Sequence, residues 1–382
     1  MINFMLCQED RIFIFKPYIT PERDCGVTID EFRQKPSFDE PFLNIDRCAL
    51  NVSNKIETII FIDSNILINM RNVIDKTISF EASGMSELVE RLNKLPNYNL
   101  SPGFAYSEIP EDRINSDNEK FNTFIDEYLP GASRQEEFIN RENKYIIKTF
   151  DNADLMDQDH LALPYAAMLH LQIVARKHYK STPIEKFREY LRRLENYVNC
   201  ITGKEIIIAQ YCFSPENIKL KPSYISDDTW NKFHERKRSF IRNFLAPRTP
   251  KDILEKRIRR PGNFNSAKKV ALNAAFDLCK INKCIGFTKT DFAHEYWLCS
   301  QDQKFFEFSK SFKFIESSEA FLFDYCNYCN SADFWVQTSL MFNEKLKSRS
   351  QAGYNLESMS VETIQSKIPK AESELKEVFE NI

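Results

Sequence analysis

The stretch Ile56–Met70, IETIIFIDSNILINM, decides the fold that the sequence predicts. Residues 59–62 form an apolar run with the length and branched side chains of a β-strand buried on both faces. Asp63 ends this run, Ser64 is suited to cap a helix, and from Asn65 the apolar residues recur at helical spacing. In open α/β sheets, ligands bind outside the carboxyl ends of strands, so Asp63 is a candidate for chemistry. The plainer alternative is that Asp63 only caps the helix.

Two further acids follow predicted strands. After a helical pattern at Gly84–Leu95, the short run Tyr98–Ser101 predicts a strand, and Glu108 comes soon after it. The run Tyr296–Ser300 predicts another buried strand, and Asp302 follows it. This order of strands and helices favours a parallel sheet with helical crossovers.

A fourth acid, Asp277, lies on a helix predicted at Asn263–Ile281, among apolar neighbours. Burying a carboxylate is costly unless it is paired or bound to a metal ion. Asp159, which opens another apolar, alanine-rich helix, is a rival for the same role. We place Asp277 first because its helix runs into the strand that precedes Asp302.

If the predicted strands are neighbours in the sheet, the four acids converge on one crevice. Carboxylates so close together would repel one another, and hard divalent cations such as Mg²⁺ or Mn²⁺ relieve that repulsion. Such ions activate a water molecule and stabilise the leaving oxygen of a phosphodiester. Hydrolysis of nucleic acid is therefore the expected chemistry, and it requires no histidine base.

The first half of this arrangement resembles the PIN-domain nucleases. Their first strand ends in Asp with Asn two residues later, which is similar to Asp63 and Asn65 in FIDSNIL. A second strand then leads to a Glu at the start of a helix, and LSPGFAYSEI with Glu108 is similar to this pattern. Both matches fall within residues 56–109.

The second half of the resemblance covers residues 263–315. In the family, a helix that carries Asp precedes a strand with Ser or Thr two residues before a last Asp. Asp277 is similar to the helical acid, and Ser300 and Asp302 are similar to the pair at the strand end. The family pattern also has a Phe soon afterwards, where this chain has Phe305.

The resemblance implies a Rossmann-like three-layer α/β/α sandwich with a central parallel sheet. It also implies Mg²⁺- or Mn²⁺-dependent cleavage of RNA, often single-stranded, with the four acids as catalytic metal ligands. Asn65 and Ser300 would orient those ligands. The same resemblance suggests a role as a toxin or in phage defence. Because a free nuclease is hazardous to its cell, we expect control by a regulatory protein partner.

Two other functions stay open. A non-catalytic PIN-like scaffold would keep the fold and bind RNA or protein. A DNA nuclease would use the same metal site, because both polymers present the same phosphodiester and carboxylates cannot tell them apart.

The sequence predicts five parts. These are an N-terminal extension at 1–55, the first half of the nuclease domain at 56–109, a mostly helical insertion at 110–262, the second half of the domain at 263–320, and a C-terminal helical extension at 321–382. Within the insertion, Gln135–Phe150 predicts a helix and Glu205–Phe213 predicts a further strand.

The segment 231–260 contains eleven Lys or Arg residues and three acids. Phe233, Phe240 and Phe244 are interleaved with these cations. Rings that stack on bases and cations that pair with phosphates are typical of a groove for RNA or single-stranded DNA. The candidate binding residues are Arg236, Lys237, Arg238, Arg257, Arg259 and Arg260. The alternative is a solvated basic helix whose aromatic face is buried.

Composition and the lack of certain motifs narrow the classes of protein to which the chain could belong. The net charge of −3 over 382 residues favours no particular partner, so any surface for nucleic acid must be local. Ten cysteines without regular spacing, and an N-terminus unlike a secretory signal, predict a cytoplasmic protein with reduced thiols. No apolar run is long enough for a membrane span, and neither GxxxxGK[ST] nor GxGxxG is present. The sequence leaves a homo-oligomer open.

Overall fold

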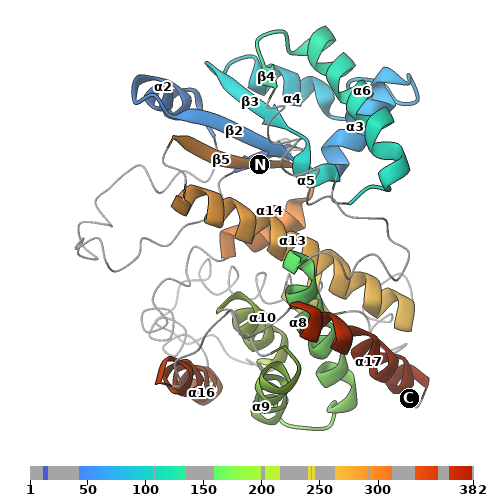
Figure 1. Cartoon of the computed structure of the whole chain (residues 1–382), viewed down its shortest axis with the longest axis vertical. Coiled ribbons are helices and arrows are strands. Elements are labelled where there is room, and N and C mark those ends of the chain that lie inside the picture. The colour runs from blue at the N-terminus through green and yellow to red at the C-terminus, as the bar shows by residue number, and fades with distance from the viewer. Residues whose placement is uncertain are drawn as a thin grey trace, which may run out of the picture. The chain divides into compact units, whose positions relative to one another are not determined.

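The chain is a mixed α/β protein with two compact units in the computed structural model (Figure 1). The sheet unit comprises Met1–Asp157 and Lys280–Lys310, and the helical unit comprises Gln158–Cys279 and Ser311–Ile382. The long helix α13 (Phe264–Thr290) contributes residues to both units. The structure describes residues 12–15, 43–106, 108–134, 159–198, 203–215, 240–241, 243–245, 263–290, 293–311, 332–351 and 361–380.

The sheet has the strand order β1-β5-β2-β3-β4. Its strands are β1 (Phe13–Phe15), β2 (Glu57–Ile62), β3 (Tyr98–Ser101), β4 (Ser133–Arg134) and β5 (His294–Ser300). β2 is parallel to both β3 and β5, β3 is parallel to β4, and β1 joins the edge antiparallel to β5. The strands predicted before Asp63, before Glu108 and before Asp302 are thus confirmed, and they are adjacent.

This order creates a switch point between β2 and β5. From β2 the chain proceeds to β3 and β4 on one side, and then returns to place β5 on the other side of β2. In open α/β sheets, ligands bind outside the carboxyl ends of the strands at such a switch point. Asp63 follows β2 at this point, and Ser300 ends β5.

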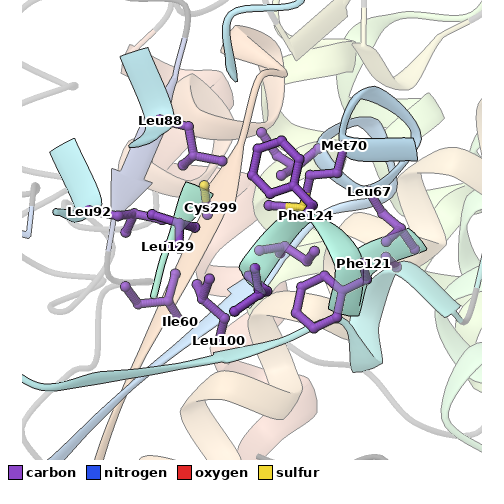
Figure 2. Packing of buried hydrophobic residues seen from close by; sticks show 14 of the residues in the cluster. Ile60, Leu67, Met70, Leu88, Leu92, Leu100, Phe121, Phe124, Leu129 and Cys299 are labelled. Atoms are coloured by element: carbon purple, nitrogen blue, oxygen red, sulfur yellow. The ribbon is translucent and has the colours of Figure 1, made fainter. Parts of the chain in front are cut away.

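Both faces of β2 are buried, as the sequence predicts. Ile60 and Ile62 point into the core shown in Figure 2, which lies between the sheet and the helices α3 (Ser64–Ile74), α4 (Met85–Leu92) and α6 (Glu111–Tyr128). On the other face, the Phe61 ring stacks between Phe104, at 4.2 Å, and Tyr296, at 5.8 Å between ring centroids. Alternate residues of a strand point to opposite faces, so four consecutive apolar residues serve both sides.

The sheet unit draws on more of the chain than residues 56–109. Residues 12–15, from the predicted N-terminal extension, supply β1. Residues 111–134, from the predicted insertion, supply α6 and β4. The helix expected at Gln135–Phe150 lies outside the described residues. Three shorter helices complete the described part of this unit: α2 (Ile45–Ser53), α5 (Gly103–Tyr106) and α14 (Gln303–Ser311).

A buried carboxylate fastens α2 to the sheet. Glu295 on β5 is 4% exposed and accepts hydrogen bonds from the Arg47 guanidinium, at 2.6 Å to Nη2 and 3.1 Å to Nε. The Asn51 side chain donates both to Glu295 and to the Thr58 hydroxyl on β2. The bidentate pair neutralises a charge that would otherwise be costly to bury.

Replacing Arg47 with Met is expected to lower the free energy of unfolding by about 2 kcal/mol, because Glu295 stays buried without its cation. Chemical denaturation followed by circular dichroism measures the change. Lys94→Met is the matched control: it breaks the exposed Lys94–Glu90 pair, which is expected to contribute less than about 0.5 kcal/mol. Equal losses in the two variants would contradict the anchoring role of Glu295.

The described part of the helical unit consists of helices, of which α8 (Asp159–Lys177) is the first along the chain. They include α9 (Pro183–Arg193), the π-helical turn η4 (Leu194–Val198), α10 (Gly203–Phe213), α16 (Ala332–Gln351) and α17 (Val361–Glu380). α8 contacts α9, α10 and α17. Among the described residues, no helix combines the length and the apolarity that a membrane span requires.

The prediction of a strand at Glu205–Phe213 is wrong, because these residues belong to the helix α10. All nine side chains, from Glu205 to Phe213, are buried. A helix that is surrounded on all sides shows no polar stripe, so its apolar run has the same appearance as a buried strand.

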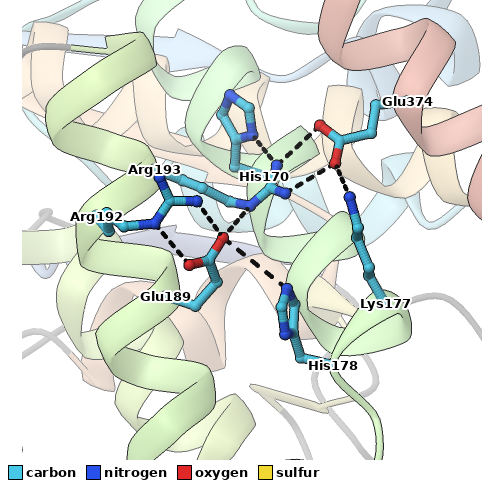
Figure 3. Close-up of polar contacts among 7 residues, drawn as sticks. All are labelled: His170, Lys177, His178, Glu189, Arg192, Arg193 and Glu374. Carbon is cyan, nitrogen blue, oxygen red and sulfur yellow. Dashed lines mark hydrogen bonds and ion pairs between the residues drawn. The ribbon is translucent and has the colours of Figure 1, made fainter.

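A polar network joins α8, α9 and α17 in this unit (Figure 3). The Arg193 guanidinium, 5% exposed, donates to both oxygens of Glu374 at 2.8 and 2.9 Å and to Glu189 at 2.9 Å. These hydrogen bonds lower the pKa of Glu374 to about 2. Burial, together with the neighbouring Arg193 charge, lowers the pKa of His170 to about 4. The folded helical unit therefore keeps Glu374 charged and His170 neutral near pH 7.

Acid is expected to destabilise the helical unit in two windows. Unfolded His170 gains a proton below its ordinary pKa of 6.5, whereas the folded form resists protonation until about pH 4, so stability falls between these values. The loss is on the order of 3 kcal/mol.

Stability from Glu374 is present above its ordinary pKa of 4.5 and is lost as the pH falls toward 2. In denaturation curves measured against pH, His170→Gln should flatten the upper window, and Glu374→Gln should flatten the lower one. Unchanged slopes would contradict the assignment.

Candidate active site

Asp63 lies at the switch point and begins α3. Its side-chain Oδ1 accepts a hydrogen bond of 2.9 Å from the Ser64 backbone N–H, so Asp63 is the N-cap residue and Ser64 is the first residue of the helix. Asp63 therefore caps the helix, and the capping role considered for Ser64 is wrong. Capping does not account for the whole environment, because Asp63 is only 7% exposed.

The second oxygen of Asp63 is held by the two predicted supporting residues. Oδ2 accepts hydrogen bonds from the Ser300 hydroxyl at 2.7 Å and from the Asn65 side-chain amide at 2.9 Å. The Asn65 side-chain amide nitrogen also lies 3.1 Å from Ser300 Oγ, and the side-chain oxygen Asn65 Oδ1 accepts from the Gln301 backbone N–H at 3.1 Å. Hydrogen bonds thus connect the residues after β2 to those at the end of β5, and they fix the orientation of the Asp63 carboxylate.

Glu108 faces Asp63 across a buried lysine. The Lys280 ammonium, on α13, donates a hydrogen bond to Asp63 Oδ1 and forms an ion pair with Glu108 Oε1. The Ser64 hydroxyl donates to the other oxygen of Glu108, Oε2. Lys280 is 4% exposed, and its Nζ lies 5.5 Å from the centre of the Phe305 ring. The site is therefore two carboxylates closed around one cation.

The two carboxylates differ in acidity. Burial by itself would raise the pKa of Asp63, but the Lys280 charge and the hydrogen bonds to Asp63 outweigh it, so this pKa lies below its ordinary value. The pKa of Glu108 is raised, first by burial and further by the neighbouring Asp63 charge, which together exceed the opposing effect of Lys280. Asp63 is thus the more firmly ionised partner of Lys280.

Asp302 occupies the rim of the site. It is exposed, and its Oδ1 accepts a 3.2 Å hydrogen bond from the Phe305 N–H at the start of α14. Its own backbone N–H donates to Ser300 Oγ at 3.0 Å. The turn that carries it is fixed by the Gln301 side chain, which donates to the Ser83 carbonyl at 2.7 Å and accepts from Asn69 at 2.5 Å. Asp302 is thus positioned as a cap at the start of α14.

The candidates for the remaining acid lie on helices. Asp277 is half-buried and precedes Lys280 by three residues on α13, in the part of the helix that belongs to the helical unit. Residues three apart share a helix face, so Asp277 and Lys280 lie on the same side of α13. Asp159, the rival, begins α8 in the helical unit, and its side chain lies outside the described residues.

The expected four-carboxylate cluster is not assembled. Within the part of the chain that the structure describes, no three side chains of His, Cys, Asp or Glu are grouped closely enough to hold a metal ion. The donors that do converge are Asp63 and Glu108, and both already face a positive charge. Carboxylate oxygens that point at one cation are the kind of ligand that Mg²⁺ and Mn²⁺ prefer. For such an ion to bind here, the Lys280 ammonium would have to move away.

Two rings of the basic segment are unavailable to nucleic acid. Phe240 and Phe244 are 1% and 2% exposed, and Phe240 stacks on Tyr211 of α10 with 4.4 Å between ring centroids. The buried aromatic face considered as the alternative is therefore correct for these two residues. The candidate cations Arg236, Lys237, Arg238, Arg257, Arg259 and Arg260, and also Phe233, lie outside the described residues.

Sequence reasoning missed Lys280, the central cation of the site. A signal was present, because Lys280 interrupts the apolar stretch from Ala274 to Ile281 as Asp277 does. A lone charge among apolar helix residues needs a partner of the opposite sign. The strand-end acids Asp63 and Glu108 were available for that role. Spacing alone did not indicate which charge on the helix faces them.

Comparison with protein-family models, with curated protein sequences and with solved structures finds no match to this chain. The chemistry of the site therefore rests on its own geometry.

Proposed function

We propose that the sheet unit is a divalent-metal-dependent endonuclease, with Mg²⁺ or Mn²⁺ as its cofactor. The observation that carries the proposal is the convergence of Asp63 and Glu108, which follow adjacent parallel strands, on one cation at the switch point of the sheet. The mixed α/β fold and the strand order are compatible with a Rossmann-like sandwich of the PIN type, which we include in the proposal.

In this function, the bound ion would activate a water molecule and stabilise the leaving oxygen of the phosphodiester. Asp63 and Glu108, which now face Lys280, would hold the ion. Asn65 and Ser300 fix the other oxygen of Asp63, so the carboxylate does not need to reorganise. Asp302, on the exposed rim, is proposed to complete the ligand set from the solvent side, and Asp277 stays a candidate ligand.

Single-stranded RNA is the proposed substrate, on the strength of the motif resemblance described above. Single-stranded DNA presents the same phosphodiester and is the alternative substrate. The cations of segment 231–260 are proposed to pair with backbone phosphates, without base stacking by Phe240 or Phe244. A regulatory protein partner is part of the same proposal, because an unrestrained nuclease damages its own cell.

One observation favours a second function. Lys280 already neutralises the Asp63–Glu108 pair, and such a closed ion cluster is what a non-catalytic scaffold would keep for stability. In this alternative the fold binds RNA or protein and cleaves neither RNA nor DNA.

Cleavage assays separate these functions. Purified wild-type protein is incubated with end-labelled single-stranded RNA or DNA in Mg²⁺, Mn²⁺ or EDTA, beside the variant Asp63→Asn. The proposal predicts metal-dependent cleavage by the wild type alone, with RNA cut faster than DNA. Binding of RNA without cleavage in any metal would favour the scaffold. Cleavage that persists in EDTA or in Asp63→Asn would contradict the proposed site.

A further inference from the structure

The two carboxylates of the candidate site are oriented in the same way. Each has one oxygen fixed by neutral side chains: Asp63 Oδ2 by Asn65 and Ser300, and Glu108 Oε2 by Ser64. The remaining oxygens, Asp63 Oδ1 and Glu108 Oε1, both face the Lys280 ammonium. The chain therefore builds a receptor for one cation and fills it with its own side chain.

Without a cation, this receptor would be unfavourable. Two carboxylates that share a nearly buried site repel each other, and burial adds the cost of removing their hydration. The Lys280 ammonium relieves both penalties, as a divalent ion would. Because the same two oxygens serve either cation, the ammonium and a metal ion cannot occupy the receptor together.

We propose that Lys280 is a resident counter-cation, which keeps the site folded without metal and must be displaced when a divalent ion binds to Asp63 and Glu108. This inference rests on the proposed metal-dependent function. The observed metal affinity is then lowered by the free energy needed to move Lys280 out of the receptor, because the two cations compete for the same oxygens.

The side chain is suited to that exchange. Lysine carries its charge on a flexible four-carbon stem, so the ammonium can leave while the α13 backbone stays in place. The face of the Phe305 ring, 5.5 Å from Nζ, offers an attractive contact on the border of the site. An arginine at this position would instead hold a carboxylate with a planar, bidentate fork and would be harder to displace.

Metal binding and stability are therefore expected to respond to Lys280 in opposite directions. Titration calorimetry with MnCl₂ on the full chain should give a dissociation constant at least about tenfold lower for Lys280→Met than for the wild type. In EDTA, the same variant should melt at a lower temperature than the wild type. Saturating Mn²⁺ should raise the melting temperature of Lys280→Met by more than it raises that of the wild type.

Two further variants control the experiment. Lys268→Met removes another ion-paired lysine from the same helix, where it contacts Glu372, and should leave Mn²⁺ affinity unchanged. Lys280→Gln supplies a neutral side chain of similar reach, so the affinity can still be measured if Lys280→Met does not fold in EDTA. Recovery of a folded Lys280→Met by Mn²⁺ would itself support the proposal.

The outcomes distinguish the counter-cation role of Lys280 from the proposed metal-dependent function. Equal Mn²⁺ affinity in wild type and Lys280 variants, or weaker binding in the variants, would overturn the counter-cation role and leave the metal site in place. No Mn²⁺ binding by any of the proteins at millimolar concentration would overturn the proposed function as well.

Discussion

Replacing Asp63 with Asn is expected to lower kcat/KM for phosphodiester cleavage by about 1000-fold. The substitution keeps the shape of the side chain but removes the charge of Oδ1, the oxygen that faces the cation position. A metal ion contributes several kcal/mol to the stabilisation of transition-state charge, and each 1.4 kcal/mol is a factor of ten in rate. Single-turnover cleavage of a labelled oligonucleotide in Mn²⁺ measures the loss.

Asp302→Asn is the companion variant for this experiment, because Asp302 is the proposed further ligand on the exposed rim. Asn is as good a helix cap as Asp, so this variant keeps the hydrogen bond from the Phe305 N–H and removes the negative charge of an exposed residue. Its expected loss in kcat/KM is about tenfold or less. Losses of equal size in both variants would show that the rim and the buried pair act as one ligand set. A fully active Asp63→Asn would refute the proposed site.

The largest effect on stability is expected from Phe61→Ala in β2. Phe61 is fully buried and its ring stacks between Phe104 and Tyr296, so truncation removes both contacts and leaves a cavity beside the sheet. Phe-to-Ala substitutions in cores cost about 3–5 kcal/mol, which is a large part of the stability of a typical domain. Urea denaturation followed by circular dichroism gives the change.

Ile68→Ala serves as the control for Phe61→Ala. Ile68 lies on α3, in the same unit, but it is 36% exposed. Its truncation is expected to cost less than about 1 kcal/mol. A comparable loss in both variants would indicate that the stacked face of β2 does not contribute to the core in the way described.

The strands that carry the site were accessible from sequence because their apolar runs are short and end at an acid. Buried strands and helix starts are encoded within a few neighbouring residues, so Asp63 at the end of β2 and Ser300 at the end of β5 could be predicted. Asn65 and Ser300, which were predicted as supporting residues, donate hydrogen bonds to Asp63 Oδ2.

Long-range contacts explain what the sequence did not indicate. The helix α10 is buried on all sides, so its apolar run lacked the polar stripe that distinguishes a helix from a strand. Lys280 reaches Asp63 from 217 residues away, and only the packed fold determines which charge of α13 faces the strand ends. Likewise, the aromatic spacing of Phe240 and Phe244 is compatible with stacking on bases or with packing against Tyr211, and burial decides between them.

The central claim is that Asp63 and Glu108 are the two halves of one divalent-cation site. It is tested most directly by crystals of the full chain soaked in MnCl₂, with data collected at the manganese absorption edge. The account predicts an anomalous peak about 2.2 Å from a carboxylate oxygen of each acid, with the Lys280 ammonium moved out of the receptor. An unchanged Lys280 bridge between Asp63 and Glu108, without a peak beside it at saturating Mn²⁺, would contradict the claim.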